Sequence, residues 1–180
     1  MQRRKFLAST LVASMAGVNI KTNASDKKGF IVKTGESRTG EHTPFMGVNP
    51  NDVKISSKDT DGKLSVFEYI GTQKVGPSLH VHFEQDEIFY VAEGEYRFQL
   101  GNERYILKAG ETIFLPRNIP HTWIQLSDRG KLIYFLQPAG KMEEFFSTMN
   151  QLKGRPTEEE MNKIHAANGM KVIGPPLTLD

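Results

Sequence analysis

Short runs of alternating apolar and polar residues fill the chain from about residue 53 to residue 137. The runs read LSVFEYI, LHVHF, EIFYVA, YRFQL, RYIL, TIFL, HTWIQL and KLIYFL, and turn residues such as Glu93-Gly94 and Ala109-Gly110 separate them. Alternation with period two is typical of strands that bury one face, and regular spacing of short strands favours a β-sandwich or barrel. We therefore expect an all-β domain of eight strands over residues 53–137.

The period of the pattern changes after residue 137. Five apolar residues then fall on one helical stripe, which is typical of a face that packs on a core: Met142, Phe145, Phe146, Met149 and Leu152. Next, Thr157 stands three residues before Glu160, the spacing of a capping box, and Gly169 suits a left-handed helix end. The sequence predicts a C-terminal pair of short α-helices within residues 138–180, with His165 as a surface or packing histidine and GPPLTLD as an extended tail.

The first 24 residues have the order of an export signal. A basic stretch and an apolar run rich in small residues, MQRRKFLASTLVASMAG, precede the polar NIKTNASDKK. The apolar run is much shorter than the roughly 20 residues that cross a bilayer. Adjacent Arg3 and Arg4 resemble the twin-arginine signal, whose route exports folded proteins. We expect cleavage after Ala24, with Ala16 as the alternative, and a periplasmic or other extracytoplasmic protein without stable membrane insertion.

Residues 25–52 are predicted to form an extended N-terminal arm. The stretch KTGESRTGEHTPFMGVNPNDV is rich in Gly, Thr, Asn and Pro and has no sustained period. His42 lies in this arm, where we expect a solvated loop histidine. The chain thus divides into a signal (1–24), an arm (25–52), a β domain (53–137) and C-terminal helices with a tail (138–180).

Composition narrows the possible chemistry. The 180 residues fit one domain with a core of its own. The chain has no cysteine, which excludes disulfides and thiolate sites, so any metal must be held by nitrogen and oxygen. The net charge of +2 depends on the signal: without its four Lys and Arg residues, 19 basic residues face 21 acidic ones. Because no basic run stands elsewhere, we expect no nucleic-acid partner.

A pair of histidines marks the candidate chemistry. His80 and His82 stand one residue apart in LHVHF, so their side chains point to the same face of a strand, as two ligands of one ion must. Glu87 opens the next strand, and His121 begins HTWIQL after the turn PRNIP. Three imidazoles and one carboxylate suit iron, manganese, nickel, copper or zinc. Two histidines on one face can also form a polar surface pair, so the spacing alone does not decide between these.

The order and spacing of these residues resemble the cupin family, whose first motif reads His-x-His, three or four residues, Glu, six residues, Gly. The positions that match are His80, His82, Glu87 and Gly94. The stretch GPSLHVH is also similar to the Gly-Pro-rich start of this motif in quercetinase-like cupins. Only Glu87 has six residues before Gly94, so of the rival carboxylates we expect Asp86 to cap the turn and Glu84 to be solvated.

The second cupin motif reads Gly, five residues, Pro-x-Gly, two residues, His, three residues, Asn. Gly110, Pro116 and His121 match it at the right spacing. Asn118 replaces the middle glycine, and because asparagine tolerates a left-handed backbone, we expect the turn to be kept. Gln125 replaces the final asparagine, which is not a ligand position in the family.

The resemblance covers about residues 60–137 and implies a cupin jelly-roll β-barrel with one divalent transition metal inside. The implied metal ligands are His80, His82, Glu87 and His121. Open coordination positions would admit a small organic substrate and dioxygen, and Glu87 would also act as the catalytic residue that takes a proton from a bound hydroxyl. The expected function is a quercetinase-like dioxygenase, an oxidoreductase for an enol, enediol or phenolic substrate. The alternatives are a metal-dependent isomerase or lyase, and a non-catalytic cupin that binds metal or a small ligand in the cell envelope.

Inward-facing apolar residues are the candidate walls of a substrate pocket, although the same residues are what a β core contains. They are Phe89, Val91, Tyr96, Phe98, Phe114 and Trp123. If Glu87 points inward, Ile88 and Tyr90 point outward on the same strand. We expect this outer face to pair in a homodimer.

Overall fold

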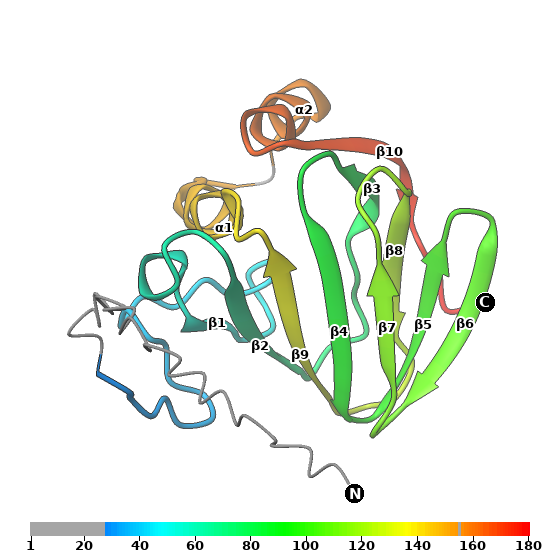
Figure 1. The fold of residues 1–180 in the computed structure, drawn as a ribbon. Helices are drawn as coiled ribbons and strands as arrows, with labels where there is room; N and C mark the ends of the chain where they lie inside the picture. Colours follow the sequence, from blue (N-terminus) through cyan, green and yellow to red (C-terminus); the bar gives the residue numbers. More distant parts are fainter. Residues whose placement is uncertain (1–27, 155) are drawn as a thin grey trace, which may run out of the picture.

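Two five-stranded antiparallel sheets and two C-terminal helices make up the protein in the computed structural model, which describes residues 28–154 and 156–180 (Figure 1). The predicted all-β class with a C-terminal pair of short helices is confirmed. The first sheet has the order β1 (Asn51–Ile55), β2 (Ser65–Gly71), β9 (Gly130–Gln137), β4 (Asp86–Glu93) and β7 (Thr112–Leu115). The second has the order β10 (Met170–Pro176), β3 (Ser78–His82), β8 (His121–Gln125), β5 (Glu95–Leu100) and β6 (Glu103–Lys108).

All eight strands expected from alternation are present as β2 to β9, but two further strands were missed. β1 begins with Asn51 and Asp52, which are polar yet buried, so its sequence lacks an apolar signal. β10 contains Gly174 and two prolines. The stretch from Gly174 onward was expected to be an extended tail that follows the second helix. β10 pairs with β3, so that Met170 lies opposite His82 and Val172 opposite His80. β10 is stabilised by pairing with β3, far away in the sequence, and β1 by pairing with β2, the next strand, rather than by an alternating pattern of their own.

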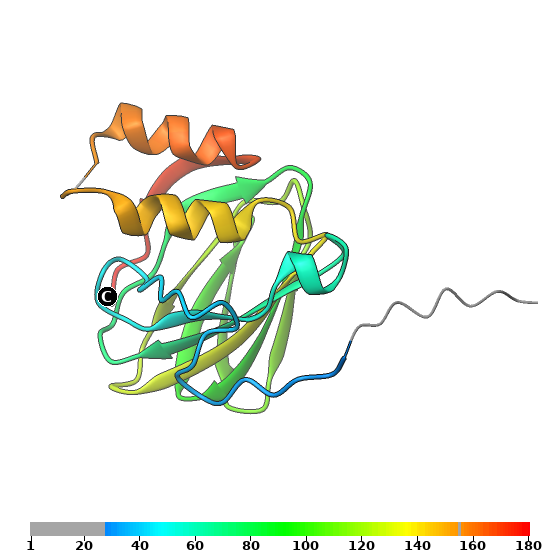
Figure 2. The ribbon, with the colours of Figure 1, turned by 90° about the vertical axis from the view of Figure 1, so that its left-hand side faces the viewer.

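The helices α1 (Met142–Gln151) and α2 (Glu158–Ala167) lie over one end of the strands, as Figures 1 and 2 show from two directions. The predicted capping box of α2 is present: Thr157 accepts a hydrogen bond from the backbone of Glu160, whose side chain bonds back to Thr157. Gly169 has φ +74°, the left-handed conformation expected after this helix. Within the two described ranges, no helix has the length and apolar character needed to span a membrane.

Aromatic stacking joins the sheets and α1 in one core. The ring of Phe67 lies 5.0 Å from that of Tyr134, and Tyr134 lies 5.0 Å from Phe89. Phe146 of α1 packs edge-on against Phe67 at 5.4 Å. The apolar stripe of α1 therefore packs on the first sheet and is part of the same core, to which Phe98 and Trp123 of the second sheet also belong.

The arm before β1 is tied to the outside of the first sheet. Gly35 N donates to the buried carboxylate of Glu68 at 2.8 Å, and Lys54 Nζ lies 3.1 Å from the same carboxylate. His42 differs from the expectation of a merely solvated side chain, because its Nδ1 lies 2.8 Å from Asp52 Oδ1 while 61 % of the side chain stays exposed. The arm is thus held by these polar contacts and also by Phe45, whose ring stacks on that of Trp123 at 5.4 Å.

Candidate metal centre

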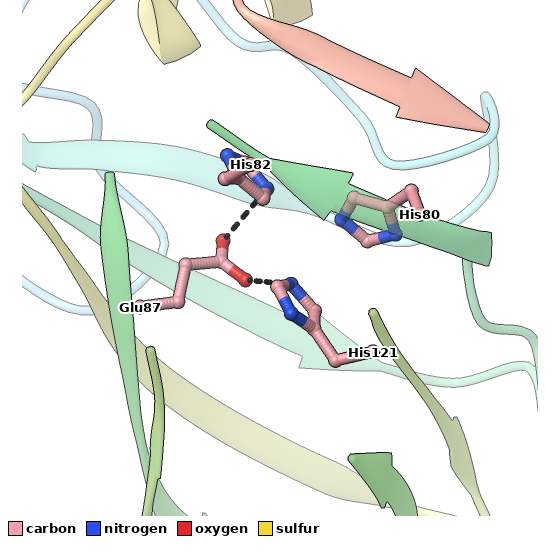
Figure 3. A group of neighbouring side chains, drawn as sticks. All are labelled: His80, His82, Glu87 and His121. Carbon is pink, nitrogen blue, oxygen red and sulfur yellow. Dashed lines mark hydrogen bonds and ion pairs between the residues drawn. The ribbon is translucent and has the colours of Figure 1, made fainter. Parts of the chain in front are cut away.

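Three strands bring the four predicted ligands together. His80 and His82 come from β3, Glu87 from β4 and His121 from β8, and in the register of the second sheet His80 lies opposite His121. One potential ligand atom from each residue can be chosen so that all four lie within 4.8 Å of one another. Figure 3 shows the four side chains converging between the two sheets. The alternation that put both histidines on one face therefore places them inside the domain.

The carboxylate of Glu87 lies between two imidazoles. Its Oε2 is 3.1 Å from His121 Nε2, and its Oε1 is 3.9 Å from His82 Nε2 (Figure 3). The rings of His80 and His121 are centred 4.7 Å apart, and those of His82 and His121 are 5.4 Å apart and nearly parallel. All four residues are at most 7 % exposed. Groups this polar are rarely buried together unless they serve a common partner.

The outer nitrogens of the three imidazoles are held by oxygen acceptors. Nδ1 of His80 lies 2.8 Å from Ser78 O, and Nδ1 of His121 lies 3.0 Å from Ile119 O. Nδ1 of His82 lies 3.3 Å from the side-chain oxygen of Gln85. Because carbonyl oxygens only accept, each Nδ1 must carry a proton, and in a neutral ring of this tautomer Nε2 is the nitrogen with the free lone pair.

The donor set fits a divalent transition metal. His82 Nε2 is buried and has no hydrogen-bond partner among residues 28–154 and 156–180, as expected for an atom meant to bind an ion. Three imidazoles and one carboxylate match the preferences of iron, manganese, nickel, copper and zinc. The residues that would hold the ion are His80, His82, Glu87 and His121.

Protonation states favour the same conclusion. Burial lowers the pKa of His80 and of His82 below the ordinary histidine value, so both imidazoles are neutral near pH 7. Burial alone would raise the pKa of Glu87, but the neighbouring imidazoles, His82 foremost, outweigh burial and lower this pKa to about 2. Neutral imidazoles and an ionised carboxylate are the forms that bind metals.

The turn before His121 is fixed on the strands that carry the other ligands. Asn118 has φ +66°, so the left-handed turn expected without the family's glycine is kept, and its backbone N donates to His82 O at 2.8 Å. Asp86 accepts three hydrogen bonds from Arg117 of this turn, so it holds this distant turn, whereas it was expected to cap the turn next to it in the sequence. Glu84 is exposed, also as expected.

Five of the six pocket candidates are packed in the core. Their side chains are 0–4 % exposed: Phe89, Val91, Tyr96, Phe98 and Trp123. The placement of Phe114 was wrong, because its side chain is 54 % exposed. In the pairing of β4 with β7, Leu115 lies opposite the inward Glu87, so Phe114 lies opposite Ile88 on the outer face. An expectation based on apolar character alone misjudged which face of this short strand is buried.

Gln85 and Gln125 have contacts that sequence reasoning did not foresee. Gln85 forms a hydrogen bond with His82. In the sequence, nothing but its position between His82 and Glu87 pointed to this role. Gln125 is fully buried and donates to Ser127 O at 2.9 Å and to Gly71 O at 3.3 Å. It also accepts from the Tyr69 hydroxyl at 3.4 Å, so it braces backbone and side chains away from the ligand cluster.

Comparison with known proteins agrees with this geometry. Residues 66–136, which include all four candidate ligands, match the family profile described as Cupin domain. This part of the chain therefore resembles a cupin domain. A solved structure of an RmlC-like cupin from Shewanella frigidimarina has a TM-score of 0.53 to this chain at 18 % identity, covering 64 % of this chain and 96 % of that one. At this identity the likeness shows the cupin fold alone.

Two curated proteins match parts of the chain. Quercetin 2,3-dioxygenase of Bacillus subtilis is 26 % identical over 110 residues, which cover 61 % of this chain and 32 % of that enzyme. The uncharacterized protein MJ1618 of Methanocaldococcus jannaschii is 42 % identical over 43 residues, or 24 % of this chain and 34 % of that protein. The matches therefore span about a third of the length of these curated relatives.

Proposed function

We propose that the protein is a metal-dependent oxidoreductase of dioxygenase type that acts on a small enol, enediol or phenolic substrate. The observation that carries the proposal is the convergence of three imidazoles and one carboxylate whose donor atoms lie within 4.8 Å of one another inside a domain that resembles the cupin family. Four protein donors leave coordination positions for further ligands, which distinguishes a site for chemistry from a closed structural one. The partial match to a quercetin 2,3-dioxygenase supports the choice of reaction type.

The residues of this chain have separate roles in the proposed reaction. A bound redox metal would supply the activation of dioxygen and of the substrate oxygen. The imidazoles of His80, His82 and His121 are held at Nδ1 by oxygen acceptors, so Nε2 would be the atom that binds the ion. Glu87 is ionised near pH 7, so its carboxylate can accept the proton of an enol or phenol hydroxyl. A dioxygenase places both atoms of dioxygen in the product, so no separate reductant is needed.

Oxygen uptake tests the proposal. Metal-replete protein is mixed in turn with a flavonol, an acireductone-like enediol and a catechol, while dioxygen is followed with an electrode and the substrate by absorbance. We expect uptake with at least one class, at one dioxygen per substrate, and its loss in the His121→Ala variant. Absence of uptake with all three classes, in protein that contains stoichiometric metal, would contradict the assignment.

Metal analysis and ligand retention, measured beside oxygen uptake, separate the alternatives. Zinc in the purified protein, together with turnover that does not consume dioxygen, would favour an isomerase or lyase that uses the ion as a Lewis acid. Tight retention of a ligand without any turnover would favour a binding protein. The metal content of protein purified from its own compartment is therefore the first quantity to measure.

We also propose export in the folded state by the twin-arginine route. The signal, residues 1–24, lies outside the described residues, so the proposal depends on its sequence. Loading before export would let the cell choose the ion in the cytoplasm instead of leaving the choice to intrinsic affinity order. Replacing Arg3 and Arg4 with lysine is expected to retain the precursor inside, and normal export of that variant would refute the proposal.

A homodimer through the outer face of the first sheet completes the proposal. Tyr90 is 41 % exposed and Phe114 is 54 % exposed on this face, next to the half-buried Ile88. Exposed aromatic side chains on a flat sheet favour association. Light scattering is expected to give twice the mass of the chain, and a monomeric mass would contradict this arrangement.

A further inference from the structure

Gln85 connects one candidate ligand with the turn that leads into α1. It lies in the connection between β3 and β4 and is only 3 % exposed. Its Oε1 is 3.3 Å from Nδ1 of His82, and its Nε2 donates to the backbone oxygen of Ala139 at 2.5 Å. A buried amide that uses both of its ends has only one orientation that satisfies both partners.

That orientation decides the tautomer of His82. The carbonyl of Ala139 can only accept, so the amide nitrogen of Gln85 must face it and the amide oxygen must face His82. An oxygen opposite Nδ1 requires a proton on Nδ1. The other nitrogen, Nε2, is then without a proton and points toward the carboxylate of Glu87, 3.9 Å away.

His82 differs from the other two histidines in what holds it. His80 and His121 are held by the backbone oxygens of Ser78 and Ile119, which are present whatever the side chains there. His82 alone depends on a side chain. Its orientation is therefore the part of the cluster that a single substitution can alter.

The backbone of Gly140 lies close against the side-chain amide of Gln85. This glycine has φ +55°, and a Cβ at its position would collide with the side-chain amide of Gln85. The turn formed by Ala139 and Gly140 directly precedes α1, which begins at Met142 and packs on the core. A contact chain thus runs from a candidate ligand through Gln85 to the start of the helix.

We propose that Gln85 is a positioning residue that fixes the tautomer of His82 and couples this ligand to the turn before α1. The inference rests on the proposed metal centre, but its first consequence can be measured without metal. Groups that orient metal-bound histidines are known to contribute to affinity, and their loss weakens binding roughly 10- to 100-fold.

The first test is the tautomer of His82 in the metal-free protein. Nitrogen-15 spectra of the histidine rings distinguish a protonated nitrogen from one with a free lone pair. In the wild type we expect His82 with its proton on Nδ1, and in Gln85→Met, which keeps the length but removes both polar ends, a mixture of both tautomers. A wild-type His82 with its proton on Nε2 would overturn the proposal even if the variant did not fold.

The second test is cobalt(II) binding by competition with a chelator. We expect Gln85→Met to bind roughly 10- to 100-fold more weakly than the wild type, with an altered visible spectrum of the bound ion. Gln151→Met, the same substitution at an exposed position of α1, is the matched control and should bind as the wild type does. Gly140→Ala leaves both partners of the amide in place but displaces it, so it should weaken binding in the same direction.

The outcomes separate this inference from the proposed function. Equal affinity and an unchanged spectrum in Gln85→Met would overturn the role of Gln85 while leaving the metal centre intact. A wild-type protein that binds no cobalt would contradict the metal centre, whereas the tautomer measurement would still decide whether Gln85 holds His82.

Discussion

Replacing Asp86 with asparagine tests how the turn before His121 is held on β4. Asp86 accepts hydrogen bonds from the backbone N, Nε and Nη2 of Arg117 at 2.8, 3.0 and 2.8 Å. Asparagine keeps one oxygen but turns an NH₂ group toward the guanidinium. The bidentate, charge-assisted contact is therefore lost while the volume of the side chain is kept.

The pKa of Asp86 gives the magnitude. The hydrogen bonds from the Arg117 side chain, more than any other contact, lower this pKa from 3.8 to about 2. One pKa unit corresponds to about 1.4 kcal/mol, so the full shift would be worth roughly 2–3 kcal/mol. The side chains are 25 % and 40 % exposed, and solvent screening reduces such values, so we expect Asp86→Asn to lower the free energy of unfolding by about 1 kcal/mol at pH 7.

The sign of the pH dependence follows from the lowered pKa. A carboxyl group with a depressed pKa in the folded state stabilises the protein above its unfolded pKa, here 3.8, and loses this contribution as pH falls toward about 2. The difference between wild type and variant should therefore be constant from pH 7 to about pH 5 and shrink below about pH 4.

Urea unfolding of both proteins at several pH values between 7 and 3 measures this difference. Asp128→Asn is the matched control, because Asp128 also pairs with a cation, Lys74, but is 94 % exposed, and it should leave stability unchanged. A difference for Asp86→Asn that stays the same at pH 3 as at pH 7 would refute the reasoning, as would equal effects of the two substitutions.

Three further experiments test the site, the core and the turn. His121→Ala removes one of four donors, so elemental analysis should find no stoichiometric metal, and retained metal would argue against the centre. Phe146→Ala should lower the free energy of unfolding by about 3–4 kcal/mol in urea, because its ring is buried against Phe67, whereas Phe114→Ala on the exposed face should cost far less; similar losses would be contrary to the described packing. Asn118→Gly should keep the melting temperature because φ is +66°, and Asn118→Val should lower stability by about 1–2 kcal/mol; a tolerated valine would speak against the left-handed turn.

One part of the ligand cluster could be anticipated from a local rule, whereas Glu87 and His121 were predicted from the resemblance to the cupin motifs. Alternation along one strand puts His80 and His82 on the same face, and the fixed spacing from Glu87 to Gly94 separates this carboxylate from its neighbours. The capping box at Thr157 is likewise decided within four residues. Such features need no knowledge of distant parts of the chain.

The features that were missed depend on partners far away in sequence. Asn51 is buried because its side chain accepts from the Tyr134 hydroxyl at 2.6 Å, which no local pattern reveals. The outward face of Phe114 follows from the register of β7 on β4, and a shift of one residue would reverse it. The role of Gln85 becomes visible only when Ala139 is brought beside it.

The pairing of β10 with β3 has a consequence for the order of assembly. β3 carries two candidate ligands, and one of its edges is completed by β10, which is synthesised only after both helices. Contacts between such distant segments form late because the intervening loop must first close. On the ribosome, the strand with His80 and His82 therefore keeps one edge unpaired until β10 has emerged, so the finished centre is a product of the completed chain and not of the nascent one.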